Sequence, residues 1–208
     1  MKKILSVLLV LILSIGLLAG CGTKGDTKFK DSELYTKGLM AEKGYIIGDV
    51  DEINEGINYH ISLINQDQDK KEHIGLIDFE SRENETYKNE GTTGIVYKTE
   101  TNKLKVTYEF KKDKLISLSL CGQGNKDWFT TDYLAYIVAI TNVICPKQGT
   151  EDMLDVIFSG KEETTYKLKN KGLILTQSVI PDDKIICFFF VEPYKEREKT
   201  NIHNKIKI

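Results

Sequence analysis

Apolar and polar residues alternate along several short segments of the chain, and a period of two predicts β-strands. The clearest case is residues 104–110, where Leu104, Val106, Tyr108 and Phe110 alternate with polar residues. Residues 94–99 and 115–120 flank this segment across short polar turns. Such close spacing predicts an antiparallel meander with one solvated face.

The C-terminal third repeats this pattern. Residues 164–168 and 173–179 are predicted strands, and a turn over 180–184 follows, in which Pro181 fixes one backbone angle. Residues 185–191 are almost entirely apolar, which predicts a central strand buried on both faces. A further strand is expected within 39–47.

The period changes to that of a helix over residues 128–144, where apolar residues occupy nearly every side. Asn125 or Asp127 is the expected N-cap, and Pro146 ends the helix. The apolar core of this segment is too short to span a membrane, so we expect a buried central helix. Thr150 and Gly160 are expected to bound a second, short helix.

Residues 50–79 admit two interpretations. Alternation over 58–65 and 73–79 predicts a hairpin closed by a polar loop at 66–72. Helical spacing nevertheless fits one set of apolar positions: Val50, Ile53, Ile57, Ile61 and Ile64. The beginning of this region is therefore strand or helix, and the charged residues 81–90 are expected to form a loop.

Together these segments predict an α+β fold, in which an antiparallel β-sheet of six to eight strands packs on a buried central helix. The expected domain spans residues 34–193. A polar tether over 21–33 precedes it, and a charged tail over 194–208 follows it.

The N-terminus carries the most specific motif. Lys2 and Lys3 precede an apolar run over 4–18, which is shorter than the ~20 residues of a spanning helix and ends in Leu18-Ala19-Gly20-Cys21. This pattern resembles the precursors of bacterial lipoproteins. The resemblance implies that residues 1–20 are a signal peptide, that Cys21 receives a diacylglyceryl group, and that the protein is anchored in the cell membrane, facing outside the cytoplasm.

The net charge of the predicted mature chain limits the kinds of partner that it can bind. Removing Lys2 and Lys3 from 29 basic residues leaves 27 against 31 acidic ones, a formal net charge of −4. Nucleic-acid binding needs a basic face and is not expected. Arg82 and Arg197 are the only arginines, which disfavours a site that holds phosphate through bidentate contacts.

Three cysteines remain beside Cys21, so at most one disulfide forms among Cys121, Cys145 and Cys187. Each lies among apolar residues, and we favour three small buried side chains. The chain contains no Cys-x-x-Cys pair of the kind that binds zinc or undergoes redox cycling.

Two sets of residues are candidates for a functional site. His60 and His73, with Asp67 and Asp69 between them, suggest a metal site, but hairpin pairing separates the two histidines and favours a solvated loop. The segment 121–125 contains Gly122 and Gly124 before the helix. It suggests an anion site, although a flexible turn is the favoured interpretation.

Trp128 and Tyr133 are the candidate ligand-binding residues, because aromatic side chains at the start of the central helix can line a cleft; core packing is the alternative. No Gly-x-Ser-x-Gly or His-Glu-x-x-His motif occurs, and we predict neither an enzyme nor a cofactor. The expected function is a non-catalytic envelope lipoprotein that binds a protein or an envelope component. The alternative is a small-ligand binder or sensor with a pocket between sheet and helix, and an envelope hydrolase ranks last.

Overall fold

The computed structural model describes residues 29–66, 68–69, 72–87, 91–146, 151–159 and 161–194. In this part of the chain a seven-stranded antiparallel sheet has the order β3-β4-β5-β6-β9-β8-β7. The strands are β3 (Ile77–Tyr87), β4 (Thr92–Thr99), β5 (Leu104–Lys111), β6 (Lys114–Gly124), β7 (Glu163–Leu168), β8 (Leu173–Ile180) and β9 (Ile185–Pro193). The predicted α+β fold is confirmed.

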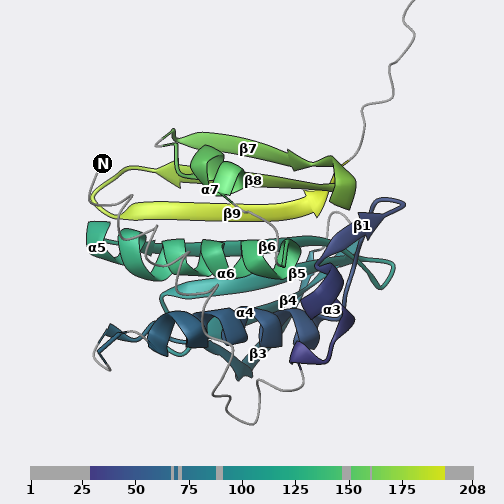
Figure 1. The fold of residues 1–208 in the computed structure, drawn as a ribbon, viewed down its shortest axis with the longest axis horizontal. Helices are drawn as coiled ribbons and strands as arrows, with labels where there is room; N and C mark the ends of the chain where they lie inside the picture. The colour runs from purple at the N-terminus through teal and green to yellow at the C-terminus, as the bar shows by residue number, and fades with distance from the viewer. Residues whose placement is uncertain are drawn as a thin grey trace, which may run out of the picture.

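Helices cover one face of this sheet. Figure 1 shows α4 (Val50–Gln66) and α6 (Leu134–Ile144) side by side, with α7 (Glu151–Ile157) over β7 and β8. The strand residues that face these helices form the core, and in β9 they are Cys187, Phe189 and Val191, each 0% exposed. The predicted short second helix corresponds to α7, and its proposed caps, Thr150 and Gly160, lie outside the described residues.

The hairpin predicted at 58–65 is wrong, and the helical alternative is correct. Asp49 accepts hydrogen bonds from the backbone N–H groups of Asp51 and Glu52 and so caps α4. Ile53, Ile57 and Ile61 are each 0% exposed, as their helical spacing predicts. Because α4 is buried over a wide arc, Tyr59 and Leu63 are buried as well, and this produced the misleading alternation.

The loop predicted over 81–90 is also wrong, since β3 runs through most of it. Glu80, Arg82, Glu83 and Glu85 are charged because β3 is an edge strand, where charges prevent pairing with other chains. The beginning of β3 is held by α4. Asn58 exchanges two hydrogen bonds with the backbone of Ile77, and Asn65 does the same with Ile74.

The central helix forms as predicted, with an irregular start. Asn125 caps α5 (Lys126–Trp128) by accepting a hydrogen bond from the Trp128 N–H, and a π-helical turn (Phe129–Tyr133) leads into α6. Every residue of α6 except Asn142 is buried, which agrees with the sequence prediction.

One small hairpin closes an end of the sheet. It consists of β1 (Met40–Glu42) and β2 (Tyr45–Ile47), and it follows α3 (Glu33–Lys37). Lys171 donates a hydrogen bond from its Nζ to the Lys37 carbonyl. Gly172 has a φ of 65°, and a Cβ there would lie 2.6 Å from the Ala41 carbonyl oxygen, so glycine permits the close approach of the hairpin.

Candidate binding face

The sheet face opposite the helices is here called the outer face, and along β7, β8 and β9 it is open to solvent among the described residues. Side chains alternate across a strand, so residues that lie between core positions point outward. On β7, β8 and β9 every outward residue is half-buried or exposed. The prediction that 185–191 is buried on both faces is therefore wrong for its outward residues.

Two phenylalanines stand at the centre of the outer face. Phe188 and Phe190 have ring centroids 6.3 Å apart and planes inclined by 7°, so the two rings stack along β9. We call this pair the aromatic ridge. Both side chains remain half-buried although strand neighbours flank them on each side.

Small residues border the ridge. Phe188 lies opposite Cys121 on β6 and Ser178 on β8, and Phe190 lies opposite Ser119 and Thr176. Short side chains cannot cover the flanks of a phenyl ring, so the ridge presents its edges as well as its tip. Ile186 and Ile180 extend the apolar strip toward the β8–β9 turn, and Ile180 is 47% exposed.

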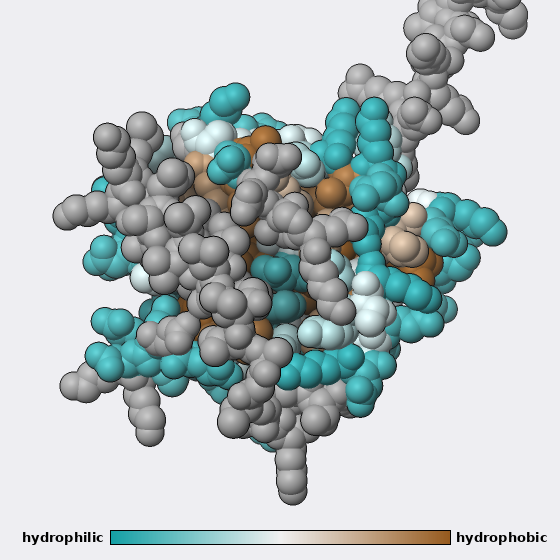
Figure 2. All heavy atoms as spheres, in the orientation of Figure 1, coloured by the Kyte–Doolittle hydropathy of each residue, from teal (hydrophilic) through white to brown (hydrophobic). Residues whose placement is uncertain are grey.

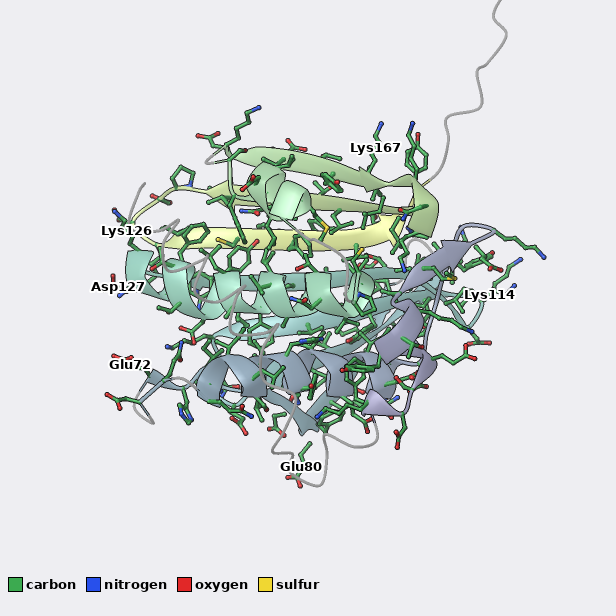
Figure 3. The ribbon with its side chains drawn as sticks, in the orientation of Figure 1. Glu72, Glu80, Lys114, Lys126, Asp127 and Lys167 are labelled. Carbon is green, nitrogen blue, oxygen red and sulfur yellow. The ribbon has the colours of Figure 1, made fainter. Side chains whose placement is uncertain are left out.

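A hollow of about 900 Å³ adjoins the other end of the ridge. The β1–β2 hairpin forms one wall, and the ends of β5 to β9 form the rest. We call it the basic hollow, and its lining is Lys43, Gly44, Tyr45, Lys111, Ile116, Lys167, Ile174, Glu192, Pro193 and Tyr194. Figure 3 places Lys114 and Lys167 at this end of the molecule, and Glu72, Lys126 and Asp127 at the opposite end.

Two tyrosines of the hollow carry lysines over their rings. The Lys114 Nζ lies 4.7 Å from the centroid of Tyr45, and the Lys167 Nζ lies 5.5 Å from that of Tyr194. Both distances fall within the range of cation–π attraction. The rings therefore help to hold positive charge at this end of the sheet.

Trp128 and Tyr133, the ligand-binding candidates, lie together on the helix side, with ring centroids 5.8 Å apart. Trp128 is 5% exposed and Tyr133 is 0% exposed. The indole rests on Gly124, where a Cβ would lie 2.4 Å from the ring. The Trp128 Nε1 and the Tyr133 hydroxyl have no hydrogen-bond partner among the described residues, and a ligand role for the two stays a prediction.

The predicted turn at 121–125 is instead the end of β6, with Asn125 as the cap of α5. Gly122 and Gly124 leave room for the Trp128 ring, because a Cβ at Gly122 would lie 2.8 Å from it.

The histidines lie apart in the fold. His60 is buried in α4, whereas His73 is exposed, with its Nε2 3.3 Å from the Gln68 carbonyl oxygen. Asp67 lies outside the described residues, and Asp69 is in the same loop as Gln68. The described residues contain no group of three or more potential metal ligands.

All three described cysteines are free thiols. Cys145 and Cys187 are buried, as predicted. The same prediction is wrong for Cys121, which is only half-buried because it points to the outer face. Partial burial raises the pKa of Cys121 and keeps its thiol protonated at neutral pH.

Cys21 and the predicted signal peptide lie outside the described residues. Among the described helices, none combines the length and apolar character needed to cross a membrane.

Neither the aromatic ridge nor the basic hollow is predicted by the sequence patterns. A signal for the ridge existed, since the outward positions of the neighbouring strands are small and polar (Ser119, Thr176, Ser178) and do not suggest a covering layer. The lysines of the hollow come from separate segments, and only the fold joins them. No family model, curated protein or solved structure matches this chain.

Proposed function

We propose that this protein is a membrane-anchored, non-catalytic binding module of the cell envelope that captures a protein partner on the aromatic ridge. The anchor part of the proposal rests on Leu18-Ala19-Gly20-Cys21 and the charged and apolar segments before it. Two acyl chains suffice for stable attachment to a membrane.

The observation that supports the binding site is the stacked pair Phe188 and Phe190 on an open sheet face. Apolar surface that stays in solvent is costly, and contiguous exposed patches mark interaction sites. Aromatic side chains are enriched where proteins bind each other, because each buries a large area with few rotatable bonds.

The chemistry of the outer face favours binding over catalysis. Its one thiol, Cys121, has a raised pKa, whereas a nucleophilic cysteine needs a lowered one. Among the other groups with shifted pKa values, burial on the helix side is the largest cause for His60 and Tyr108. The pKa of Tyr87 on β3 is raised to about 12, mainly by its hydrogen bond to Glu85.

Site-specific photo-crosslinking in native membranes tests this proposal. A photoreactive residue is placed at Thr176, beside the ridge, and in a second protein at Val156 on α7, which is 38% exposed on the helix side. We expect a discrete protein adduct from position 176 and not from position 156.

The double variant Phe188→Ser, Phe190→Ser is expected to lose this adduct, because it removes both rings of the aromatic ridge. The variant should still fold, since both side chains point away from the core. Phe79→Ser is the matched control, since Phe79 is an aromatic residue on the edge strand β3 and is 41% exposed. An adduct that survives the double variant, or equal adducts from both photoreactive positions, would contradict a partner site at the ridge.

A further inference from the structure

The basic hollow brings together three lysines from separate segments of the chain, Lys43, Lys111 and Lys167. Among the described residues, Lys43, Lys111 and Lys167 form no ion pair with a carboxylate, and Glu192 is the only acidic residue of the lining. Figure 2 shows hydrophilic residues beside a few apolar ones at this end of the molecule, around the β1–β2 hairpin. The charge is notable because the predicted mature chain is acidic overall.

One tight turn places a lysine of the hollow at a conformational cost. Lys43 and Gly44 connect β1 to β2 with φ of 53° and 82°. Two-residue turns with positive φ at both positions favour Asn-Gly, because asparagine and glycine tolerate that backbone. The chain instead holds a lysine at the first position of this turn.

The shape of the site favours a ligand that enters it. About 900 Å³ lies within the usual range of ligand pockets and is far more than one phosphate group fills. The lysines lie around a concavity formed by the hairpin and the sheet, and a flat bilayer surface fits such a concavity poorly.

Lysine also restricts the kind of anion. The lining contains no arginine, so its contacts are those of separate point charges rather than of a planar fork. The scarcity of arginine in the sequence disfavours bidentate phosphate contacts, but it does not disfavour contacts from separate lysines. Several separated ammonium groups suit a ligand with several separated negative charges.

From this arrangement we infer that the basic hollow binds a soluble polyanion, a chain that carries repeated phosphate or carboxylate groups. The inference goes beyond the proposed function, because the hollow and the aromatic ridge are separate sites that can be tested independently.

Linear polyphosphate is the probe for the test. Binding of fluorescently labelled polyphosphate to the full-length lipidated protein in a neutral detergent is followed by anisotropy at several salt concentrations. We expect saturable binding whose affinity falls linearly with added salt on logarithmic axes, as counterions are released. Failure of the unaltered protein to bind at low salt would overturn the inference.

Charge-matched variants locate the site. The triple variant Lys43→Asn, Lys111→Gln, Lys167→Gln should lose about tenfold or more in affinity, while Asn at position 43 suits the turn and preserves stability. The control Lys126→Gln, Lys161→Gln, Lys184→Gln removes equal charge from exposed positions outside the hollow and should bind as the unaltered protein does. Equal losses in both triples would mean non-specific attraction and refute the site.

A second arm distinguishes a soluble chain from lipid headgroups. The anchored protein is placed in phosphatidylcholine vesicles, and acetylation of Lys43 and Lys167 by a water-soluble reagent is measured. Protection by polyphosphate supports the inference; protection by added phosphatidylglycerol alone would assign the lysines to the bilayer and overturn it. Phe188→Ser, Phe190→Ser should leave polyphosphate binding intact, so failure of the ridge and failure of the hollow give different results.

Discussion

His60 is a histidine buried in α4. Neither ring nitrogen has a hydrogen-bond partner among the described residues, and the imidazole packs edge-on against Phe29 and Tyr59, with centroid distances of 6.0 Å and 5.2 Å. Burial disfavours the charged imidazolium and lowers the pKa of His60 from 6.5 to about 4. The side chain is therefore neutral in the folded protein at neutral pH.

This burial predicts a pH dependence of stability. The unfolded chain takes up a proton at His60 below about pH 6.5, whereas the folded protein does so only near pH 4. The free energy of unfolding should therefore fall as the pH drops through this window, by roughly 3 kcal/mol in total. Above pH 6.5 the histidine contributes no pH dependence.

Urea unfolding of the protein and of His60→Leu at several pH values measures the effect. The variant should show a flatter dependence between pH 6.5 and 4, and the difference between the two curves isolates the histidine from carboxylates that titrate in the same range. Parallel curves would contradict the predicted pKa.

The paired hydrogen bonds of Asn58 connect two elements that sequence patterns did not join. Its amide accepts from the Ile77 N–H at 2.7 Å and donates to the Ile77 carbonyl at 3.0 Å. Both backbone groups sit where β3 begins, so α4 helps to fix the start of the edge strand.

Asn58→Ala should reduce the free energy of unfolding by about 2 kcal/mol, because two backbone groups lose their partners. Amide hydrogen exchange at Ile77 should accelerate in the same variant. Asn142→Ala is the matched control, since among the described residues the Asn142 amide donates to the Val138 carbonyl of its own helix and to no second element. Unchanged exchange at Ile77 would show that α4 does not fix this strand.

Strands were predictable from sequence where a single periodicity dominated. Leu104, Val106 and Tyr108 alternate strictly with polar residues, and β5 forms there. The pattern failed for α4, where Tyr59, Ile61 and Leu63 are buried on a broad helical surface and mimic a strand. It also failed for β3, whose charges reflect an edge position that depends on the whole sheet.

The candidate sites were less predictable than the elements. Phe188 and Phe189 are adjacent and chemically identical, yet one faces solvent and the other the core. Hydrophobicity alone cannot separate them, because the distinction depends on which sheet face the helices cover. Lys43, Lys111 and Lys167 are brought together only when the hairpin packs on the sheet.

At the scale of the whole molecule, the predicted anchor is open to a direct test. Cys21→Ala should abolish incorporation of an alkyne-labelled fatty acid and leave residues 1–20 attached. In the lipoproteins that this N-terminus resembles, the cysteine thiol carries the lipid, and the signal peptide is cleaved only after the thiol has been modified. Intact mass and in-gel labelling measure both effects. Cys121→Ala should label normally, and persistent labelling of Cys21→Ala would refute the anchor.

The place of β9 in the sheet has a consequence for the order in which the protein acquires its surfaces. Although β9 is the last described strand in the chain, it pairs with β6 on one side and β8 on the other. Until it emerges during synthesis, two long strand edges remain unpaired, and such late, non-local pairing is slow and prone to aggregation. The same strand carries both phenylalanines of the ridge. A nascent or truncated chain therefore lacks the surface proposed to bind a partner, and recruitment would begin only once synthesis has reached the strand that completes the sheet.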